Sequence, residues 1–310
     1  MLSDFQSDVA VDRRGFLKCM QWAGAAVVWS LRGGVASSHL LGAPEDKAKA
    51  ADFTFVQISD SHIGFNKPAN ADVSGTLQVA VGQINSALRQ PDMILHTGDL
   101  THSARATEFD TLDQILKGLR RKEVFYVPGE HDVAGDDGRR YLERFGKSTG
   151  GKMWQSFDHK GVHFIGLNNC AQLEGPGQIG VEQLEWLSRD VAHLGSSVPI
   201  VVFAHIPLWS VYPEWGWATK DSARALSILK RFGSVTVLNG HVHQVMQRVE
   251  GNVTFHSAAS TAFPQPAPGS APAAGPINVP AGKLRQVLGI TNVSFTAGNS
   301  RLAVVDAPLG

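Results

Sequence analysis

Short apolar runs recur along the chain, and in its first half they alternate with longer segments of helical periodicity. The runs are rich in β-branched and aromatic residues and have the length of buried strands. They predict strands at residues 53–58, 93–96, 124–127, 153–157, 162–167, 198–204 and 235–238. Apolar positions that recur every three or four residues predict amphipathic helices. These helices are expected near residues 72–89, 109–119, 137–145, 181–194 and 219–229.

The second half of the chain is richer in strands. Further strand-like segments lie at residues 245–249, 253–256, 287–293 and 302–305. No segment repeats, and no position separates two hydrophobic cores. The pattern therefore predicts a single α/β domain over residues 53–310, with its sheets covered by helices. Residues 264–280 are rich in Pro, Ala and Gly and predict a long loop of the functional or mobile kind.

Residues 1–40 have the pattern of an export signal. Paired Arg13 and Arg14 are followed by Phe, Leu and Lys, then by an apolar stretch and small residues. This resembles a twin-arginine signal, so we expect a signal peptide at 1–40 and a linker at 41–52. The twin-arginine translocation machinery would be a partner, and the mature protein would be periplasmic or secreted. The alternative is an exposed N-terminal helix with a chance arginine pair.

Composition excludes several classes of partner. The chain has 28 basic and 28 acidic residues among 310, which gives a formal net charge of zero. We therefore expect no nucleic-acid-binding patch and no polybasic site for anionic lipid. The apolar stretch of the signal is too short and too rich in glycine to cross a bilayer. No stable membrane span is expected in the mature form.

Cysteine content limits the covalent chemistry. Of the two cysteines, Cys19 lies inside the predicted signal and Cys170 follows a predicted strand. Loss of the signal would leave Cys170 alone, so the mature chain could not form an intramolecular disulfide. We expect Cys170 to be a small buried residue and not a nucleophile.

Acidic and histidine side chains follow five of the predicted strands directly. The five loops carry Asp60-x-His62, Gly98-Asp99, Gly129-Glu130-His131-Asp132, His205 and Gly240-His241-x-His243. The ends of strands in an α/β sheet converge on one crevice, so we expect these side chains to meet. The neighbouring glycines permit tight turns and close approach of the backbone. Asp and His together suit a hard or borderline divalent metal ion.

The number of these side chains indicates two metal ions. Three carboxylates and four imidazoles, leaving His131 aside, exceed what a single ion would use. Two ions roughly 3.5–4 Å apart stabilise both the attacking and the leaving oxygen of an in-line displacement at phosphorus, and they lower the pKa of a shared water to about 7. The pattern therefore predicts phosphoester hydrolysis.

The ordered motifs resemble those of the calcineurin-like metallophosphoesterases, and they span Asp60 to His243. Residues 177–187 also resemble a segment of the bacterial cyclic-nucleotide-type phosphodiesterase branch. The resemblance implies a four-layer α-β-β-α sandwich, in which two mixed sheets are flanked by helices. It also implies a dinuclear centre of divalent or mixed-valence ions, of Fe, Mn or Zn, whose bridging hydroxide attacks phosphorus in line.

The resemblance also assigns the site residues. One ion would be held by Asp60, His62 and His243, the other by Glu130, His205 and His241, with Asp99 bridging them. His131 would be the catalytic residue, as general acid or as a stabiliser of phosphoryl charge. Asp132 and His102 are expected to orient these residues without binding a metal themselves.

Glu130 departs from the family pattern, which has Asn at this position. Glu adds a negative charge and one methylene of reach, and this favours harder or more highly charged ions. Our hypothesis is that Glu130 still binds the second ion. The alternative is that Glu130 turns away and leaves the second site weak or empty.

Aromatic residues predict the walls of a substrate pocket. Trp209 and Tyr212 lie in a loop with Trp215 and Trp217, and Phe263 follows a later strand. We expect Trp209, Tyr212 and Phe263 to contact the substrate, although the tryptophan-rich loop could instead form a satellite core. The predicted enzyme is a phosphodiesterase acting on a small-molecule phosphoester. A phosphomonoesterase, a pyrophosphate-cleaving hydrolase and a non-catalytic metal-binding scaffold remain as alternatives.

Overall fold

The computed structural model describes residues 26–32, 35–41, 51–170, 175–280, 282–298 and 301–310. The chain divides into two units, Met1–Lys49 and Ala50–Gly310. In the first unit, strands β1 (Ala26–Arg32) and β2 (Val35–Leu41) pair antiparallel. The arginine pair of the expected signal and most of the expected linker lie outside the described residues, so both stay predictions.

The second unit contains two mixed sheets, and the first of them has five strands. Its order is β13-β12-β3-β4-β5, with β3, β4 and β5 parallel and β12 antiparallel to both of its neighbours. The strands are β3 (Phe53–Ile58), β4 (Met93–His96), β5 (Val124–Tyr126), β12 (Gly289–Phe295) and β13 (Ala303–Pro308).

The second sheet has six strands in the order β10-β11-β9-β8-β7-β6. Its four central strands are parallel, and the two edge strands run antiparallel to them. The strands are β6 (Gln155–His159), β7 (Val162–Leu167), β8 (Ile200–Ala204), β9 (Val235–Asn239), β10 (Met246–Glu250) and β11 (Val253–Ser257).

Alternation along the strands divides the apolar residues among three core layers. In β3, Phe55 faces the other sheet while Val56 faces the helices, because successive side chains of a strand point to opposite faces. In β8, Phe203 packs between the sheets and Val202 packs under the helices on the other side. One apolar layer therefore lies between the sheets, and one lies outside each.

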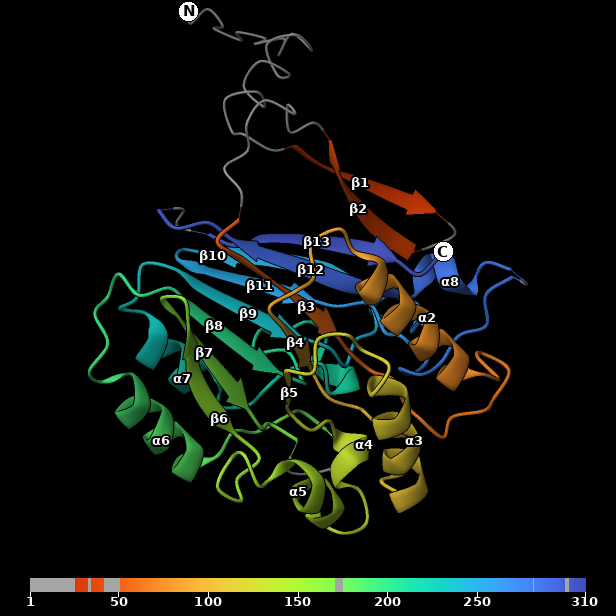
Figure 1. Ribbon diagram of the computed structural model, residues 1–310, viewed down its shortest axis with the longest axis horizontal. Helices are drawn as coiled ribbons and strands as arrows, with labels where there is room; N and C mark the ends of the chain where they lie inside the picture. The colour runs from red at the N-terminus through yellow and green to blue at the C-terminus, as the bar shows by residue number, and fades with distance from the viewer. Residues whose placement is uncertain (1–25, 33–34, 42–50, 171–174, 281, 299–300) are drawn as a thin grey trace, which may run out of the picture. The chain divides into compact units, whose positions relative to one another are not determined.

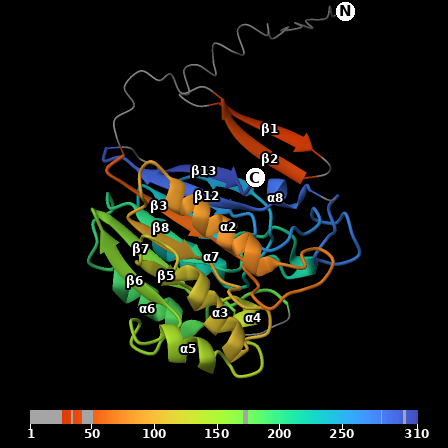
Figure 2. The ribbon, with the colours of Figure 1, turned by 45° about the vertical axis from the view of Figure 1, so that its right-hand side comes forward.

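Helices cover the outer face of each sheet (Figure 1). Helices α2 (Val73–Ser86) and α3 (Ala106–Leu116) contact each other and pack on the five-stranded sheet, as Figure 2 also shows. Helices α6 (Val181–Val191) and α7 (Ser222–Leu229) cover the six-stranded sheet. The predicted four-layer α-β-β-α sandwich is confirmed.

The remaining helices are short. They are α4 (Glu130–Val133), α5 (Arg139–Phe145), the 3₁₀ helix η1 (Pro213–Trp215) and α8 (Leu284–Val287). The sequence predicted a loop at Gly129-Glu130-His131-Asp132, and the structure shows a single helical turn. This turn forms because the Asp132 carboxylate accepts the backbone N–H of Gly129 at 2.9 Å, which caps its start.

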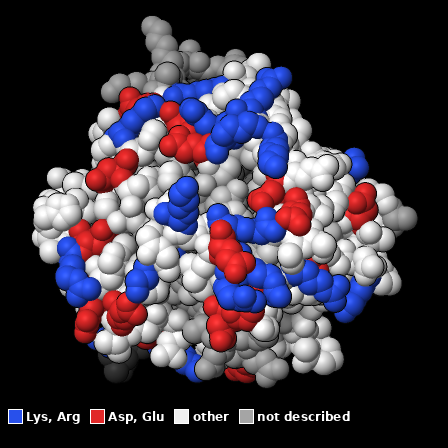
Figure 3. Space-filling view, turned by 60° about the horizontal axis from the view of Figure 1, so that its bottom comes forward, with Lys and Arg blue, Asp and Glu red and all other residues white. Residues whose placement is uncertain are grey.

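The face drawn in Figure 3 carries charges of both signs. Lys and Arg side chains are interspersed there with Asp and Glu. Among the described residues, none of the helices is long and apolar enough to cross a membrane.

Candidate metal centre

The two sheets bring the five predicted loops together. The motifs follow β3, β4 and β5 in one sheet and β8 and β9 in the other. The first two loops are joined by backbone hydrogen bonds, from Asp60 N–H to the Gly98 carbonyl at 3.0 Å and from His62 N–H to the Asp99 carbonyl at 2.9 Å. The site is therefore built on a rigid strand-end scaffold.

Five of the predicted metal ligands have a left-handed backbone. The φ angles are 53° at Asp60, 41° at His62, 50° at Asp99, 69° at His241 and 53° at His243. A positive φ is uncommon for residues other than glycine, and such strained positions concentrate at functional sites. The ligand carboxylates also lie close against the backbone of neighbouring glycines, where no side chain would fit. A Cβ at Gly129 would lie 2.0 Å from Asp99 Oδ1, and one at Gly240 would lie 2.5 Å from Asp60 Oδ2.

The first predicted ligand set is assembled. Asp60, His62 and His243 are buried, and their donor atoms lie within 4.8 Å of one another. His243 Nε2 lies 3.3 Å from Asp60 Oδ1 and 3.2 Å from His62 Nε2. Two nitrogens and an oxygen therefore converge on one point.

The second predicted set is assembled beside the first and includes Glu130. Its carboxylate oxygens lie 2.9 Å from His205 Nε2 and 2.9 Å from His241 Nδ1. Burial alone would raise the pKa of Glu130, but the charges of His241 and His205 hold it well below its usual range. Glu130 thus offers an ionised carboxylate at the position that the family pattern gives to an amide.

Asp99 lies between the two sets. Its Oδ2 is 3.3 Å from His62 Nε2 in the first set and 3.5 Å from His205 Nε2 in the second. Its other oxygen, Oδ1, accepts the backbone N–H of His131 at 3.0 Å. The carboxylate is therefore held in the position that a bridging ligand would need.

Backbone carbonyls fix the tautomers of two of the histidines. Nδ1 of His205 lies 2.7 Å from the Thr97 carbonyl, and Nδ1 of His243 lies 2.6 Å from the Phe263 carbonyl. A carbonyl can only accept, so each Nδ1 carries the proton. Each Nε2 is then free to bind a metal, which is the usual arrangement in metal-binding histidines.

The donor atoms are suited to bind divalent metal ions. Glu130 Oε2, His205 Nε2 and both ring nitrogens of His241 are buried without a hydrogen-bond partner. Buried polar atoms are normally satisfied, so four such atoms in one cluster need a further occupant. Oxygen and imidazole donors suit hard or borderline divalent ions, and the cluster has no thiolate.

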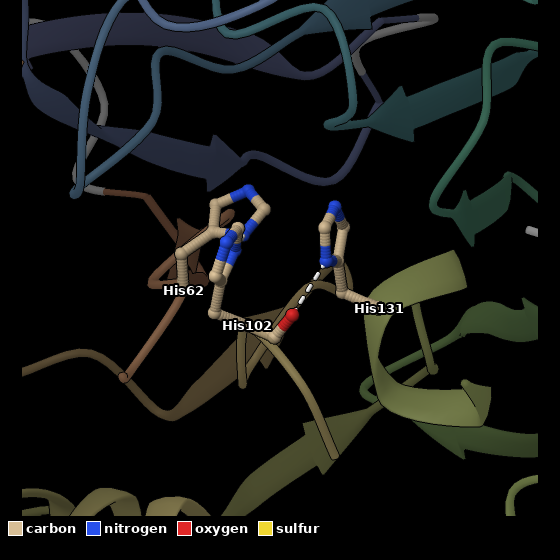
Figure 4. A group of neighbouring side chains, drawn as sticks. All are labelled: His62, His102 and His131. Carbon is tan, nitrogen blue, oxygen red and sulfur yellow. Dashed lines mark hydrogen bonds between the residues drawn. The ribbon is translucent and has the colours of Figure 1, made fainter. Parts of the chain in front are cut away.

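His131 lies next to the metal ligands with its ring oriented by the backbone. Its Nδ1 lies 2.7 Å from the carbonyl oxygen of His102 (Figure 4). Burial opposes protonation of the ring, but the carboxylates of Asp99 and Glu130 outweigh burial and raise the pKa of His131. A half-buried imidazole with a raised pKa beside a ligand cluster is suited to donate a proton.

Asp132 is fully buried and ties the loops together. Its carboxylate accepts hydrogen bonds from the backbone N–H groups of Leu100, Thr101 and Gly129 and from the Thr101 hydroxyl, at 2.9–3.0 Å. Burial and the charge of Asp99 raise the pKa of Asp132 to about 7, while the backbone donors work against this rise. The Asp132 carboxylate thus joins the loop after β4 to the start of α4.

His102 contacts a ligand and the neighbouring His131. Its ring Nδ1 is 3.3 Å from His62 Nδ1, and its ring stacks on that of His131 with centroids 4.7 Å apart. Burial and the charge of His131 lower the pKa of His102 to about 4.

A cavity of about 310 Å³ opens over the cluster. His62, Asp99, Glu130, His131 and His241 line its polar side. The apolar wall is formed by Phe65, Ile206, Trp215, Trp217 and Phe263. Lys67, Gln265 and residues 274–276 also line it, so the Pro-rich loop over 264–280 contributes to the site.

The aromatic wall differs from the expected one. Phe263 lines the cavity, whereas Trp209 is buried under helices α6 and α7 and packs on Phe255, with ring centroids 5.3 Å apart. Tyr212 lies outside the lining, with its hydroxyl near Gly269. Trp209 thus follows the satellite-core alternative, because its side chain completes the apolar layer of the six-stranded sheet.

Sequence reasoning missed Phe65 and Lys67, which line the cavity. They lie just after the Asp60-x-His62 motif, in a segment without periodicity. The one feature of the sequence that could have indicated them is their closeness to that motif along the chain. Trp215 and Trp217 were noticed in the sequence but were not selected.

Comparison with known proteins agrees with this site. A family profile described as calcineurin-like phosphoesterase matches residues 53–245. A probable glycerophosphodiester phosphodiesterase of Arcobacter nitrofigilis is 24% identical over 66% of this chain and 77% of its own length. A probable cyclic nucleotide phosphodiesterase of Vesicomyosocius okutanii is 24% identical over 68% of this chain and 88% of its own.

Solved structures share the fold. A dimetal phosphatase from Danio rerio superposes with a TM-score of 0.63 at 14% identity, covering 84% of this chain and 97% of its own. The purple acid phosphatase PPD1 of yellow lupin gives a TM-score of 0.58 at 13% identity, covering 83% of this chain and 51% of its own. The match over residues 53–245, with the phosphodiesterase-named relatives, shows that the chain belongs to the calcineurin-like phosphoesterase family and is a phosphoester hydrolase.

Proposed function

We propose that the protein is a phosphodiesterase with a dinuclear metal centre. The observation that carries the proposal is the position of Asp99, whose Oδ2 lies within 3.5 Å of a histidine nitrogen in each ligand set. Asp60, His62 and His243 would hold one ion, and Glu130, His205 and His241 the other. Glu130 supports a filled second site because it points at both histidines of its set.

Each part of the site has a task in hydrolysis. When held by the two ligand sets, divalent ions would supply hydroxide at neutral pH and would stabilise the charge that develops on the phosphoryl oxygens. His131 lines the same cavity, and its Nδ1 proton is engaged by the His102 carbonyl, so Nε2 is its free nitrogen. We assign that nitrogen to the leaving oxygen, where it donates a proton as the bond to phosphorus breaks.

The apolar wall favours a diester over a monoester. A phosphomonoester has one organic substituent and a diester has two, so a diester gains more from apolar surface on both sides of phosphorus. Trp215, Trp217 and Phe263 supply such surface within the cavity. Two relatives that match 66% and 68% of this chain are named as probable phosphodiesterases, which supports the same assignment.

The test is a profile of metal against substrate. The apo-protein is reconstituted with Mn, Fe, Zn or Co and assayed with bis-p-nitrophenyl phosphate and p-nitrophenyl phosphate. We expect kcat/KM for the diester to exceed that for the monoester by about tenfold or more with the best metal. A preference for the monoester would make the protein a phosphomonoesterase. Two bound ions without hydrolysis of either substrate would indicate a metal-binding scaffold.

The apolar wall can be tested separately with Trp215→Ala. Loss of one aromatic contact is expected to raise KM for the diester by about three- to tenfold, with kcat changed less. Trp154→Ala is the matched control, since Trp154 packs near Trp186 and does not line the cavity. Equal KM values in the two variants would remove the wall from substrate binding.

We also propose export by the twin-arginine route to the periplasm or beyond. The support is the arginine pair at Arg13 and Arg14, followed by Phe, Leu and Lys. Arg13→Lys with Arg14→Lys should leave the full-length precursor in the cytoplasm of a bacterial host, while the unaltered chain is processed and exported. Processing of both forms to the same extent would contradict the proposal.

A further inference from the structure

His62 differs from the other anchored histidine ligands in the partner of its Nδ1. His205 and His243 each face a backbone carbonyl, which can only accept a hydrogen bond. The Nδ1 of His62 instead faces a ring nitrogen, Nδ1 of His102, at 3.3 Å. A ring nitrogen either donates or accepts, so the tautomer of His62 depends on the tautomer of His102.

Metal binding decides which of the two rings donates. His62 directs Nε2 to the ligand cluster, where it lies 3.3 Å from Asp99 Oδ2 and 3.2 Å from His243 Nε2. A nitrogen that binds a metal has no proton, so Nδ1 of the neutral ring must carry it. Nδ1 of His102 then has to accept, which places the proton of His102 on Nε2.

His102 also holds His131 through a different atom. Its backbone carbonyl lies 2.7 Å from His131 Nδ1, and its ring stacks on the His131 ring at an interplanar angle of 18°. The carbonyl forces the proton onto Nδ1 of His131 when that ring is neutral. In Figure 4 the ring of His102 therefore faces His62, a predicted metal ligand, and its backbone carbonyl faces His131, the proposed acid.

The backbone of His102 is fixed well enough for this task. Its N–H donates to the Ile63 carbonyl at 2.9 Å, and Ile63 N–H donates to the Leu100 carbonyl at 3.1 Å. Ile63 and Thr101 form a parallel β-bridge, and Asp132 holds the Thr101 N–H. The ring packs edge-on against Phe65 at 5.2 Å. Both polar groups of His102 are thus presented from an ordered segment.

We propose that His102 is a positioning residue that holds two histidines at once: its ring Nδ1 accepts the Nδ1–H of metal-bound His62, and its carbonyl oxygen accepts the Nδ1–H of His131. The proposal rests on the proposed ligand role of His62 and acid role of His131. It assigns to one residue, through its ring and its backbone carbonyl, a coupling between the metal site and the proton donor. The coupling runs through three histidines, His62, His102 and His131, and involves no carboxylate.

The direct test reads the tautomers in the zinc-loaded protein. With ¹⁵N-labelled histidine at about pH 9, where ordinary imidazoles are neutral, ring ¹⁵N shifts distinguish the two tautomers. We expect Nδ1–H in His62 and His131 and Nε2–H in His102. An Nε2–H tautomer in His131, or Nδ1–H in His102, would overturn the proposal. This measurement needs no turnover, so it is independent of the substrate assignment.

The second test measures metal affinity in matched variants. His102→Leu keeps the apolar packing but removes the acceptor, whereas Oδ1 in His102→Asn can take the place of Nδ1. Loss of such a ligand-orienting partner typically weakens metal binding about 10- to 100-fold. We expect this loss for one of the two ions in the leucine variant, with the asparagine variant recovering to within about threefold.

Controls separate this role from a merely structural one. His193→Leu changes an exposed histidine outside the site and should bind both ions as the unaltered protein does. Equal metal affinities in His102→Leu and the unaltered protein would contradict the proposal, as would an asparagine variant as weak as the leucine one. A third ion per chain, lost in His102→Leu, would instead make the three histidines of Figure 4 a metal site. If the leucine variant does not fold, the tautomers measured by ¹⁵N shifts in the unaltered protein still test the proposal.

Discussion

Glu130 Oε2 lies 2.9 Å from Nε2 of His205, and neither atom has a hydrogen-bond partner. The two atoms therefore lie side by side without a hydrogen bond between them, as two ligands of one metal ion would. The other Glu130 oxygen makes an equivalent approach to His241. A carboxylate that had turned away from the second site would show neither contact, so the geometry favours the ligand role over the empty-site alternative.

Removal of the Glu130 carboxylate should empty the second site. In Glu130→Ala we expect metal content to fall from two ions per chain towards one after dialysis, because the second set keeps only two histidines of its own. Metal content is measured by inductively coupled plasma mass spectrometry. Glu130→Asn restores the family residue and serves as the control, with occupancy recovered at least in part. Two ions retained in the alanine variant would end the ligand hypothesis.

His131 can be separated from metal binding. His131→Ala should keep both ions, because the His131 ring belongs to neither ligand set and makes its hydrogen bond to the His102 carbonyl. We expect kcat to fall by about 10²- to 10⁴-fold for a diester with a basic alkoxide leaving group. The loss should be much smaller for p-nitrophenolate, which leaves without protonation. Stopped assays on both substrates measure this, and an equal loss on the two would remove the acid role.

Asp132 is expected to contribute to stability more than to chemistry. Asp132→Ala leaves four donors without an acceptor in a fully buried position. Unsatisfied buried donors cost about 1–3 kcal/mol each before relaxation, so we expect a loss of about 3 kcal/mol or more. Urea unfolding of the apo-protein measures the free energy of unfolding. Glu185→Ala is the control at an exposed acid, and it should stay within about 0.5 kcal/mol of the unaltered protein.

His163 provides a pH-dependent contribution far from the metal ligands. Its ring lies 2.7 Å from Asp158 and 2.9 Å from Asp190. Burial opposes its charge, but hydrogen bonds to Asp190 and Asp158 raise the pKa of His163, and the same contact lowers the pKa of Asp190. Because the pKa of His163 is higher in the folded than in the unfolded protein, its protonation stabilises the fold. This stabilisation is complete below the unfolded pKa of about 6.5 and is lost as the pH rises through the folded pKa.

The free energy that His163→Asn costs should therefore shrink with increasing pH. We expect a larger difference in unfolding free energy between the unaltered protein and the variant at about pH 5.5 than at about pH 9. Urea unfolding of the apo-protein at the two pH values measures it. A cost that grows towards pH 9 would show that the imidazolium does not stabilise the fold.

The sequence predicted the ligand loops because each follows a predominantly apolar, strand-like run. His62, Asp99 and His205 are polar residues at points where buried strands end, and hydrophobic periodicity locates such points well. The left-handed backbone of Asp60 and His241 has no comparable signal, because it arises from contacts between loops of different strands. The helical turn at Glu130–Val133 is too short to show periodicity.

The substrate wall was harder to predict than the metal ligands. Trp209 and Trp215 lie six positions apart in one aromatic loop, and either could have faced the cavity. Only the packing of α6 and α7 decides that Trp209 fills the core while Trp215 lines the opening. Local sequence carries no information about which of two similar side chains a distant helix will cover.

Each ligand set draws on both sheets. Asp60 and His62 follow β3 in one sheet and His243 follows β9 in the other, while Glu130 follows β5 and His205 follows β8. Any ion held by either set is thus bonded to both sheets at once, across the end of the apolar layer between them. In the described part of the chain Cys170 is the one cysteine, and it is unpaired. Bound metal would therefore act as the crosslink of this fold, so chelation should loosen the sandwich at the end where hydrolysis takes place.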